Sequence, residues 1–136
     1  MSPAYWPRDL EMKAEIPSMF NNDGGDQVMP IGRCRNAGIV NSVEFVPSWN
    51  LTGANTNSRT LVLINRRTTG TGTTTMCSLP LTSGLSLTRG VAVSLVISAA
   101  NAPVVVGDIL EWNTIHVGNG MQDPGGEVII QQSLGN

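Results

Sequence analysis

From residue 37 to the C-terminus, the chain consists of short apolar segments separated by clusters of glycine, proline, asparagine and serine. In several of these segments apolar and polar residues alternate, as in a strand with one buried face. No segment carries a convincing helical repeat. Seven or eight short strands with turns between them are typical of a β-sandwich or a β-barrel. We therefore expect one all-β domain over residues 37–136.

Two kinds of strand are expected in this domain. The first kind has one apolar face: the segment at 38–46 places Ile39, Asn41, Val43 and Phe45 on one face and Val40, Ser42, Glu44 and Val46 on the other. The second kind, at 61–65 and 109–117, has apolar residues on both faces. A single small sandwich usually leaves one side of each sheet polar. The extra apolar face predicts burial against another subunit or a partner.

Residues 1–36 differ from the rest of the chain. They hold four prolines and a polar run at 21–27, and the segment between Pro7 and Pro17 is too short for a stable isolated helix. We expect an extended N-terminal arm that becomes ordered on a partner surface, so that the sandwich folds without residues 1–30. The side chains expected to contact the partner are Tyr5, Trp6, Arg8, Met12, Met19 and Phe20.

Composition argues against several classes of function. Charged residues make up 13% of the chain, only one lysine is present, and the net charge is −2. Nucleic-acid binding relies on clustered basic residues, so it is not expected. No apolar run approaches the roughly 20 residues of a membrane span, and no signal peptide is visible. Cys34 and Cys77 fit free thiols in a reducing compartment, with a single disulfide as the alternative.

The stretch at 104–126 contains the most chemically suggestive residues. Its single histidine, His116, has no second histidine with which to bind a metal. Asp108 and Glu111 point to opposite faces of the strand, so they do not form an acid–base pair. We therefore expect no catalytic residue, no metal site and no cofactor.

The same stretch is better interpreted as a strand with a turn at each end. Gly107 and Asp108 form a tight turn before the strand, and Pro124 presets a turn after it. Trp112 shares a face with Leu110 and is expected to anchor the core. Gly107, Asp108, Trp112 and Pro124 are thus assigned structural roles.

Several of these segments together resemble a known group of proteins. Their order and spacing are similar to those of head decoration (cement) proteins of tailed bacteriophages. The resemblance covers about residues 38–131 and rests on Thr52 to Asn57, Arg59, Asn65-Arg66, Gly107-Asp108, Trp112 and Gly118 to Gly126.

The resemblance implies a jelly-roll-like β-sandwich on the exterior of a virion, with the major capsid protein as partner, and no enzymatic activity. It also implies a homotrimer, because such proteins commonly sit where three capsid subunits meet. A virion-surface adhesin or carbohydrate-binding module is the alternative. A hydrolase is disfavoured, since one histidine and scattered carboxylates offer little for catalysis.

Overall fold

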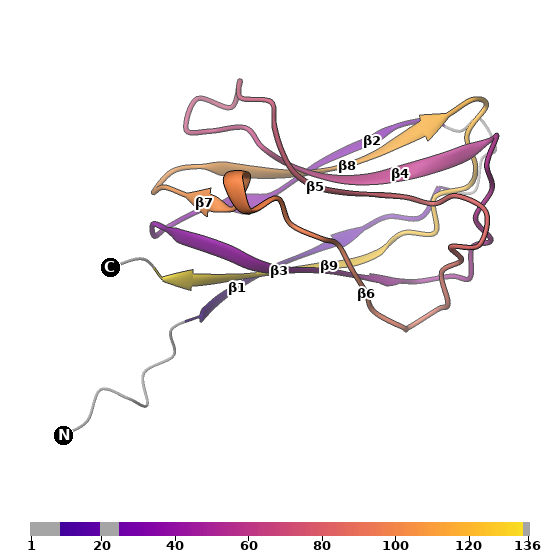
Figure 1. The fold of residues 1–136 in the computed structure, drawn as a ribbon, viewed down its shortest axis with the longest axis horizontal. Coiled ribbons are helices and arrows are strands. Elements are labelled where there is room, and N and C mark those ends of the chain that lie inside the picture. The colour runs from indigo at the N-terminus through magenta and orange to yellow at the C-terminus, as the bar shows by residue number, and fades with distance from the viewer. Residues whose placement is uncertain (1–8, 20–24, 135–136) are drawn as a thin grey trace.

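A computed structural model describes residues 9–19 and 25–134 of the chain. Figure 1 shows two β-sheets packed face to face, with the strands of both running along the long axis. Within the described residues there are nine strands and a single short 3₁₀ turn, η2 (Ala99–Asn101). The expected all-β sandwich is therefore confirmed.

The first sheet joins both ends of the described chain. β1 (Asp9–Ile16) pairs with β9 (Gly126–Leu134), and β9 pairs with β3 (Gly38–Pro47). The short strands β6 (Val93–Ser94) and β7 (Pro103–Val104) both pair with the other side of β3. The order is β1-β9-β3-β6, with every pairing antiparallel.

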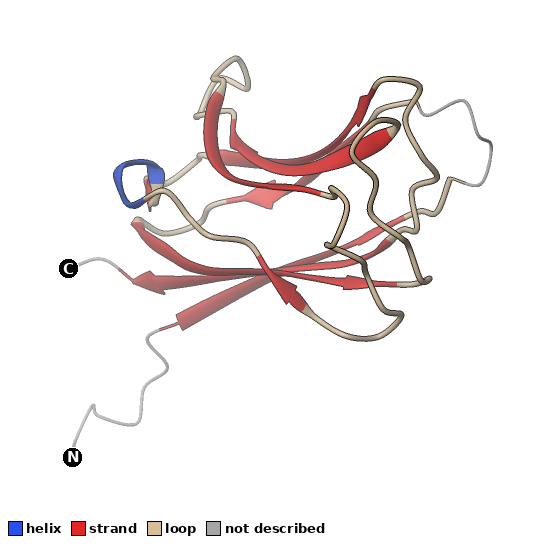
Figure 2. Cartoon of the chain, turned by 45° about the vertical axis from the view of Figure 1, so that its right-hand side comes forward, coloured by secondary structure: helices blue, strands red, loops and turns tan. Residues whose placement is uncertain are grey.

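The second sheet has the order β2-β8-β4-β5. Its strands are β2 (Gln27–Arg33), β8 (Ile109–Val117), β4 (Ser58–Asn65) and β5 (Thr74–Pro80). Successive strands mostly alternate between the two sheets, and this pair of strand orders is that of a jelly roll. Figure 2 shows the loops that connect the sheets gathered at the two ends of the sandwich.

The prediction that residues 1–36 form an arm outside the sandwich is wrong for two segments of that range. Residues 9–16 form β1 and residues 27–33 form β2, so each supplies an edge strand of one sheet. In β1 the side chains of Met12 and Ile16 pack on the core, because they alternate with charged residues that point away. The sandwich therefore begins at β1 rather than at residue 37, and a chain without residues 1–30 lacks β1 and the first part of β2.

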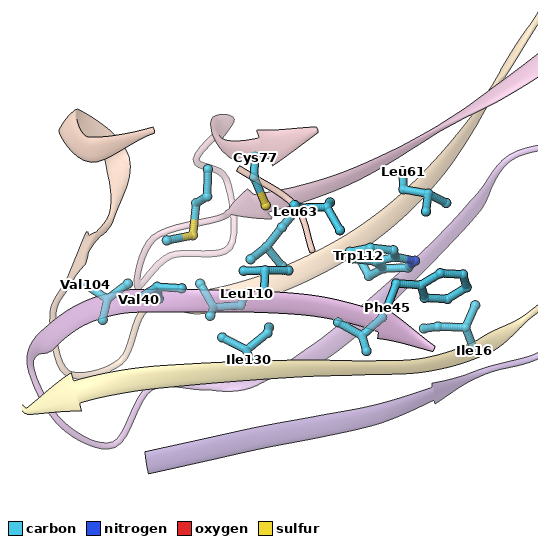
Figure 3. Packing of buried hydrophobic residues seen from close by; sticks show 14 of the residues in the cluster. Ile16, Val40, Phe45, Leu61, Leu63, Cys77, Val104, Leu110, Trp112 and Ile130 are labelled. Atoms are coloured by element: carbon cyan, nitrogen blue, oxygen red, sulfur yellow. The ribbon is translucent and has the colours of Figure 1, made fainter. Parts of the chain in front are cut away.

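The core fills the space between the sheets. Figure 3 shows Phe45 and Trp112 facing each other across it, and their rings stack with centroids 5.6 Å apart. Both side chains are fully buried. Leu61, Leu63 and Leu110 contribute from the second sheet, which confirms the shared face of Leu110 and Trp112.

The prediction that Ile39 lies on the same face of β3 as Val43 and Phe45 is wrong. Val40 is 1% exposed whereas Ile39 is 52% exposed, yet Val43 and Phe45 are buried as expected. The register of β3 against β9 shifts between Val40 and Ser42. This β-bulge adds one residue and reverses the alternation before it, so Val40 shares the inner face with Val43.

Candidate functional site

The turn before β8 is built around Gly107 and Asp108, as expected. Gly107 has φ +94°, which favours glycine, and its N–H donates to the carbonyl of Cys34 at 2.8 Å. The Asp108 N–H donates to the carbonyl of Val105 at 3.1 Å, which closes the turn. The turn carries the chain from β7 in one sheet to β8 in the other and holds it against the end of β2.

The carboxylate of Asp108 is buried and joins two segments of the resembled pattern. Its Oδ2 accepts hydrogen bonds from Asn65 Nδ2 at 2.9 Å and from the N–H of Val105 at 3.0 Å. Nη1 of the exposed Arg67 lies 3.8 Å from the same oxygen. The Asn65-Arg66 and Gly107-Asp108 segments therefore meet in space, where they fix loops rather than present a reactive group.

A second buried polar group lies at the opposite end of β8, around Arg59. The Arg59 side chain is 1% exposed and donates to the carbonyls of Met121 at 2.7 Å, Gly25 at 2.9 Å and Thr114 at 3.1 Å. Its Nη1 lies 4.0 Å from Oδ2 of the buried Asp123. Three segments that are distant in sequence, around residues 25, 59 and 114–121, are thus joined by one guanidinium group.

Asp123 completes this arrangement, which we call the Arg59 cluster (Arg59, Thr114, Asp123 and Gln27). Oδ2 of Asp123 accepts from Thr114 Oγ1 at 2.6 Å and from Gln27 Nε2 at 2.9 Å. Oδ1 accepts from the N–H of Gly125 at 2.9 Å, which shapes the turn that contains the buried Pro124. A glycine is required at 125, where φ is +67° and a Cβ would lie 2.6 Å from the carbonyl oxygen of Ile16.

His116 is paired with Asp26 at the surface. Its Nδ1 lies 2.6 Å from Asp26 Oδ1, and its backbone N–H donates to the same oxygen at 2.8 Å. The backbone hydrogen bond from His116 is the main cause that lowers the pKa of Asp26 below its usual range. The ionised carboxylate therefore helps hold β2 to β8 at neutral pH, and this weak, solvent-screened contribution is lost as the pH falls through the lowered pKa.

Both cysteines are free and buried, and their surroundings do not activate the thiols. Burial, and secondly the charge of Asp108, raise the pKa of Cys34 to about 11. Burial raises the pKa of Cys77 to about 12, although a backbone hydrogen bond with Leu63 opposes this shift. The alternative of a Cys34–Cys77 disulfide is thus not what the structure contains.

Because the thiolate is the reactive form, the native protein is expected to react very slowly with Ellman's reagent at pH 8. A thiol of pKa about 11 is ionised to roughly one part in a thousand at that pH. Both thiols are expected to react within minutes once the chain is unfolded in guanidinium chloride. Rapid modification of the native protein would contradict the buried placement, and a Cys34→Ser variant would show which thiol is responsible.

The side chains expected to contact a partner from the arm are only partly described. Tyr5, Trp6, Arg8 and Phe20 lie outside the described residues. Met12 packs against the core cluster, and Met19 forms an isolated β-bridge with Asp123. The two methionines therefore stabilise the sandwich instead of extending from it.

The outward side of the β2-β8-β4-β5 sheet carries the extra apolar residues expected from the sequence. Asn113 in β8 lies between Val28 of β2 and Val62 of β4, and Ile115 is opposite Thr60 of β4. Val28 and Ile115 are 57% and 38% exposed. We call this surface the outer face, and its apolar members, none of which belongs to the core cluster, are Val28, Pro30, Val62, Ile64, Pro80, Ile109, Ile115 and Val117.

Polar and apolar side chains are interspersed on the outer face, because Glu111 of β8 lies between Pro30 and Ile64 of the neighbouring strands. Glu111 forms an ion pair in which Arg66 Nη2 lies 2.7 Å from its Oε1, and Asn113 Nδ2 donates to the same oxygen at 3.1 Å. Both members of the ion pair are partly buried. Such a surface offers contact area of mixed chemistry without a reactive centre.

Residues 9–19 and 25–134 contain neither a metal-binding group of side chains nor a membrane-spanning helix. No group of three or more histidine, cysteine, aspartate or glutamate residues there is arranged to hold a metal ion. No helix in that part of the chain has the length and apolar character needed to cross a membrane. Comparison of the chain with protein-family models, with curated proteins and with solved structures found no match.

Proposed function

We propose that this chain is a structural capsid decoration, or cement, protein that binds the outside of a phage head and stabilises contacts between major capsid subunits. The observation that carries this proposal is the group of exposed apolar side chains on the outer face of the β2-β8-β4-β5 sheet, which includes Val28, Ile115 and Val117. An exposed apolar face of this kind marks an interaction surface. A cement protein works by adding such contact area and needs no catalytic group.

The placement of the resembled segments supports the proposal. Asn65-Arg66 and Gly107-Asp108 meet at the buried Asp108 at one end of β8, and Arg59 meets the segment at 118–126 in the Arg59 cluster at the other end. Both groups fix the loops at the ends of a rigid sandwich, and a rigid surface loses less conformational entropy when it binds. The jelly-roll arrangement is also one that recurs in viral capsid domains.

The proposed assembly state is a homotrimer on the capsid exterior. In a three-fold ring the outer face of one copy meets a different surface of the next copy. Native mass spectrometry at micromolar concentration is expected to show a trimer, and Ile115→Lys is expected to shift it to monomers by placing a charge in the contact.

Val96 provides the matched control, because it is 88% exposed and follows β6 in the opposite sheet. A Val96→Lys variant should therefore remain trimeric. A clean dimer would instead indicate outer faces packed symmetrically on each other and would overturn the trimer. A monomeric wild-type chain would also overturn it.

Capsid binding is tested by co-sedimentation with expanded heads assembled from the major capsid protein of the phage that would carry this gene. The protein is expected to pellet with heads at a saturating, symmetry-related stoichiometry and to remain soluble without them. Failure of the folded wild-type protein to pellet with heads would remove the proposal.

A virion-surface adhesin or carbohydrate-binding module is the second candidate, and one observation favours it. Trp49 is 49% exposed, and the guanidinium of Arg89 lies 5.6 Å from the centre of its ring. An exposed indole can stack on a sugar, and jelly rolls also occur in lectins. Glycan binding that is lost in Trp49→Ala, together with no binding to heads, would move this candidate to first place.

A further inference from the structure

A second group of exposed apolar side chains lies at the end of the sandwich where β3 begins, and we call it the end patch (Ile39, Pro103, Val105 and Val106). Ile39 is 52% exposed and pairs directly with the exposed Pro103 of β7. Val105 and Val106, which follow β7, are 53% and 62% exposed. Figure 1 shows β7 beside the first part of β3. None of the four side chains belongs to the core cluster, so packing within the chain does not account for them.

The backbone holds the end patch in a fixed conformation. The β-bulge in β3 turns the side chain of Ile39 outward. The N–H of Val105 donates to the buried carboxylate of Asp108 at 3.0 Å, and the carbonyl of Val105 accepts from the N–H of Asp108 at 3.1 Å. Ile39, Val105 and Val106 are also β-branched, so they have few rotamers to lose. Such a surface loses little conformational entropy when another molecule covers it.

The end patch and the outer face are similar in size and chemistry. The exposed apolar members of the outer face are Val28, Pro30, Pro80, Ile115 and Val117. Like the end patch, they are β-branched residues and prolines. Each of the two surfaces presents roughly 300 Å² of apolar area, the size at which a patch on a single chain often has a function. The surfaces lie on different sheets, so one chain cannot cover one of them with the other.

The charges at the borders of the two surfaces have opposite sign. Val106 lines a groove together with the exposed Arg33 and Arg35. Neither arginine makes an ion pair or a side-chain hydrogen bond with any other residue in the part of the chain that the structure describes. Beside the outer face, the exposed Asp26 precedes Val28 by two residues. Contact between two end patches would bring the arginines of both copies together, whereas contact between an end patch and an outer face brings them toward a carboxylate.

We propose that the end patch binds the outer face of a second copy of this chain. The apolar side chains form the centre of the contact, and Arg33 and Arg35 lie at its rim, where charges set orientation more than affinity. A symmetric contact between two outer faces would leave both end patches exposed, whereas this head-to-tail contact covers both kinds of surface. Copies joined in this way form a ring when the rotation closes. The end patch thus supplies the second surface of the proposed homotrimer, and only the number of copies rests on that proposal.

Single variants of the full chain test the contact, with native mass spectrometry at micromolar concentrations as the measurement. Ile39→Glu places a charge in the end patch and is expected to weaken self-association at least about tenfold. Val106→Glu is expected to do the same and replaces Ile39→Glu if that variant does not fold. Val91→Glu is the matched control, because Val91 is 54% exposed and belongs to neither surface; it should change self-association less than about twofold. Unchanged self-association in a folded end-patch variant would overturn the proposal, as would a monomeric wild type.

A mixture of two defective variants tests whether the contact joins two different surfaces. Ile115→Lys alters only the outer face and Ile39→Glu only the end patch, so each variant alone is expected to be monomeric. In the mixture, the intact end patch of the first variant can bind the intact outer face of the second, and complexes that contain both chains are expected. Self-association of either variant alone would indicate a symmetric contact. That result, or a mixture that stays monomeric, would overturn the proposal.

The contact between copies and the capsid function fail in distinguishable ways. Formation of the mixed complexes by a protein that does not pellet with heads would remove the proposed function and leave the contact standing. Binding of the wild type to heads, together with self-association of Ile39→Glu that equals that of the wild type, would overturn the contact and leave the decoration role standing.

Discussion

Replacing Trp112 with alanine is expected to lower the free energy of unfolding by about 3–5 kcal/mol. Trp112 is fully buried at the centre of the sandwich and stacks on Phe45 of the opposite sheet. The truncation removes this contact between the sheets and leaves a cavity that the flanking strands cannot fill. The loss is a large part of the stability of a domain of this size. Denaturant unfolding followed by circular dichroism measures it.

Trp49 offers a control of the same residue type, because it lies on a loop and is half-exposed. Trp49→Ala is expected to cost less than about 1 kcal/mol. If Trp112→Ala does not fold, Trp112→Phe provides the milder measurement and should still lose stability relative to the wild type. A Trp112→Ala protein that unfolds at the same denaturant concentration as the wild type would contradict the core described above.

Replacing Arg59 with methionine is expected to have an effect of similar size, about 3–5 kcal/mol. Methionine fills part of the volume but leaves the carbonyls of Gly25, Thr114 and Met121 without their donor. It also leaves the buried carboxylate of Asp123 without a nearby positive charge. Unpaired polar groups of this kind are costly in a low-dielectric interior.

Two further measurements separate this explanation from a general loss of packing. Arg35→Met removes an exposed arginine and should change stability by less than about 0.5 kcal/mol. The double variant Arg59→Met, Asp123→Asn should be more stable than the sum of the two single losses, because the residues are coupled. Strict additivity would show that the Arg59 cluster does not act as a unit.

The core strands were predictable from the sequence because their pattern is local. Leu110 and Trp112 were expected to share an inner face, and both occupy it. The segment at 61–65 was expected as a strand, but its apolar residues on both sides do not show which face is the inner one. Pro80 indicates that its strand is an edge or bulged strand, and β5 is an edge strand whose register against β4 shifts between Leu63 and Ile64. The bulge that exposes Ile39 was not predictable, since an extra residue in one strand is defined only by its partner.

The first two strands were missed for a different physical reason. Residues 10–16 do alternate, but their inward positions include Ala14, and the nearby prolines favour an interrupted segment. β1 is stabilised by pairing with β9, which is more than a hundred residues away in sequence. Such long-range pairing leaves little trace in a local pattern.

The buried polar groups around Asp108 and Arg59 were only partly predictable from the sequence. The turn residues Gly107, Asp108 and Pro124 follow from known turn preferences. A buried arginine at position 59 does not, because arginine is rarely buried unless it is paired, and its partners come from distant loops. Its position on the inward side of β4, two residues before Leu61, is the one signal in the sequence that pointed to it.

The central claim is that this protein stabilises a phage head by adding contact area between capsid subunits. The most direct test is the temperature at which expanded heads disassemble, measured by calorimetry with and without a saturating amount of the protein. We expect the disassembly temperature to rise with occupancy and to level off when the sites are filled, because a ligand that binds only the assembled state stabilises it. An unchanged disassembly temperature at full occupancy would contradict the claim.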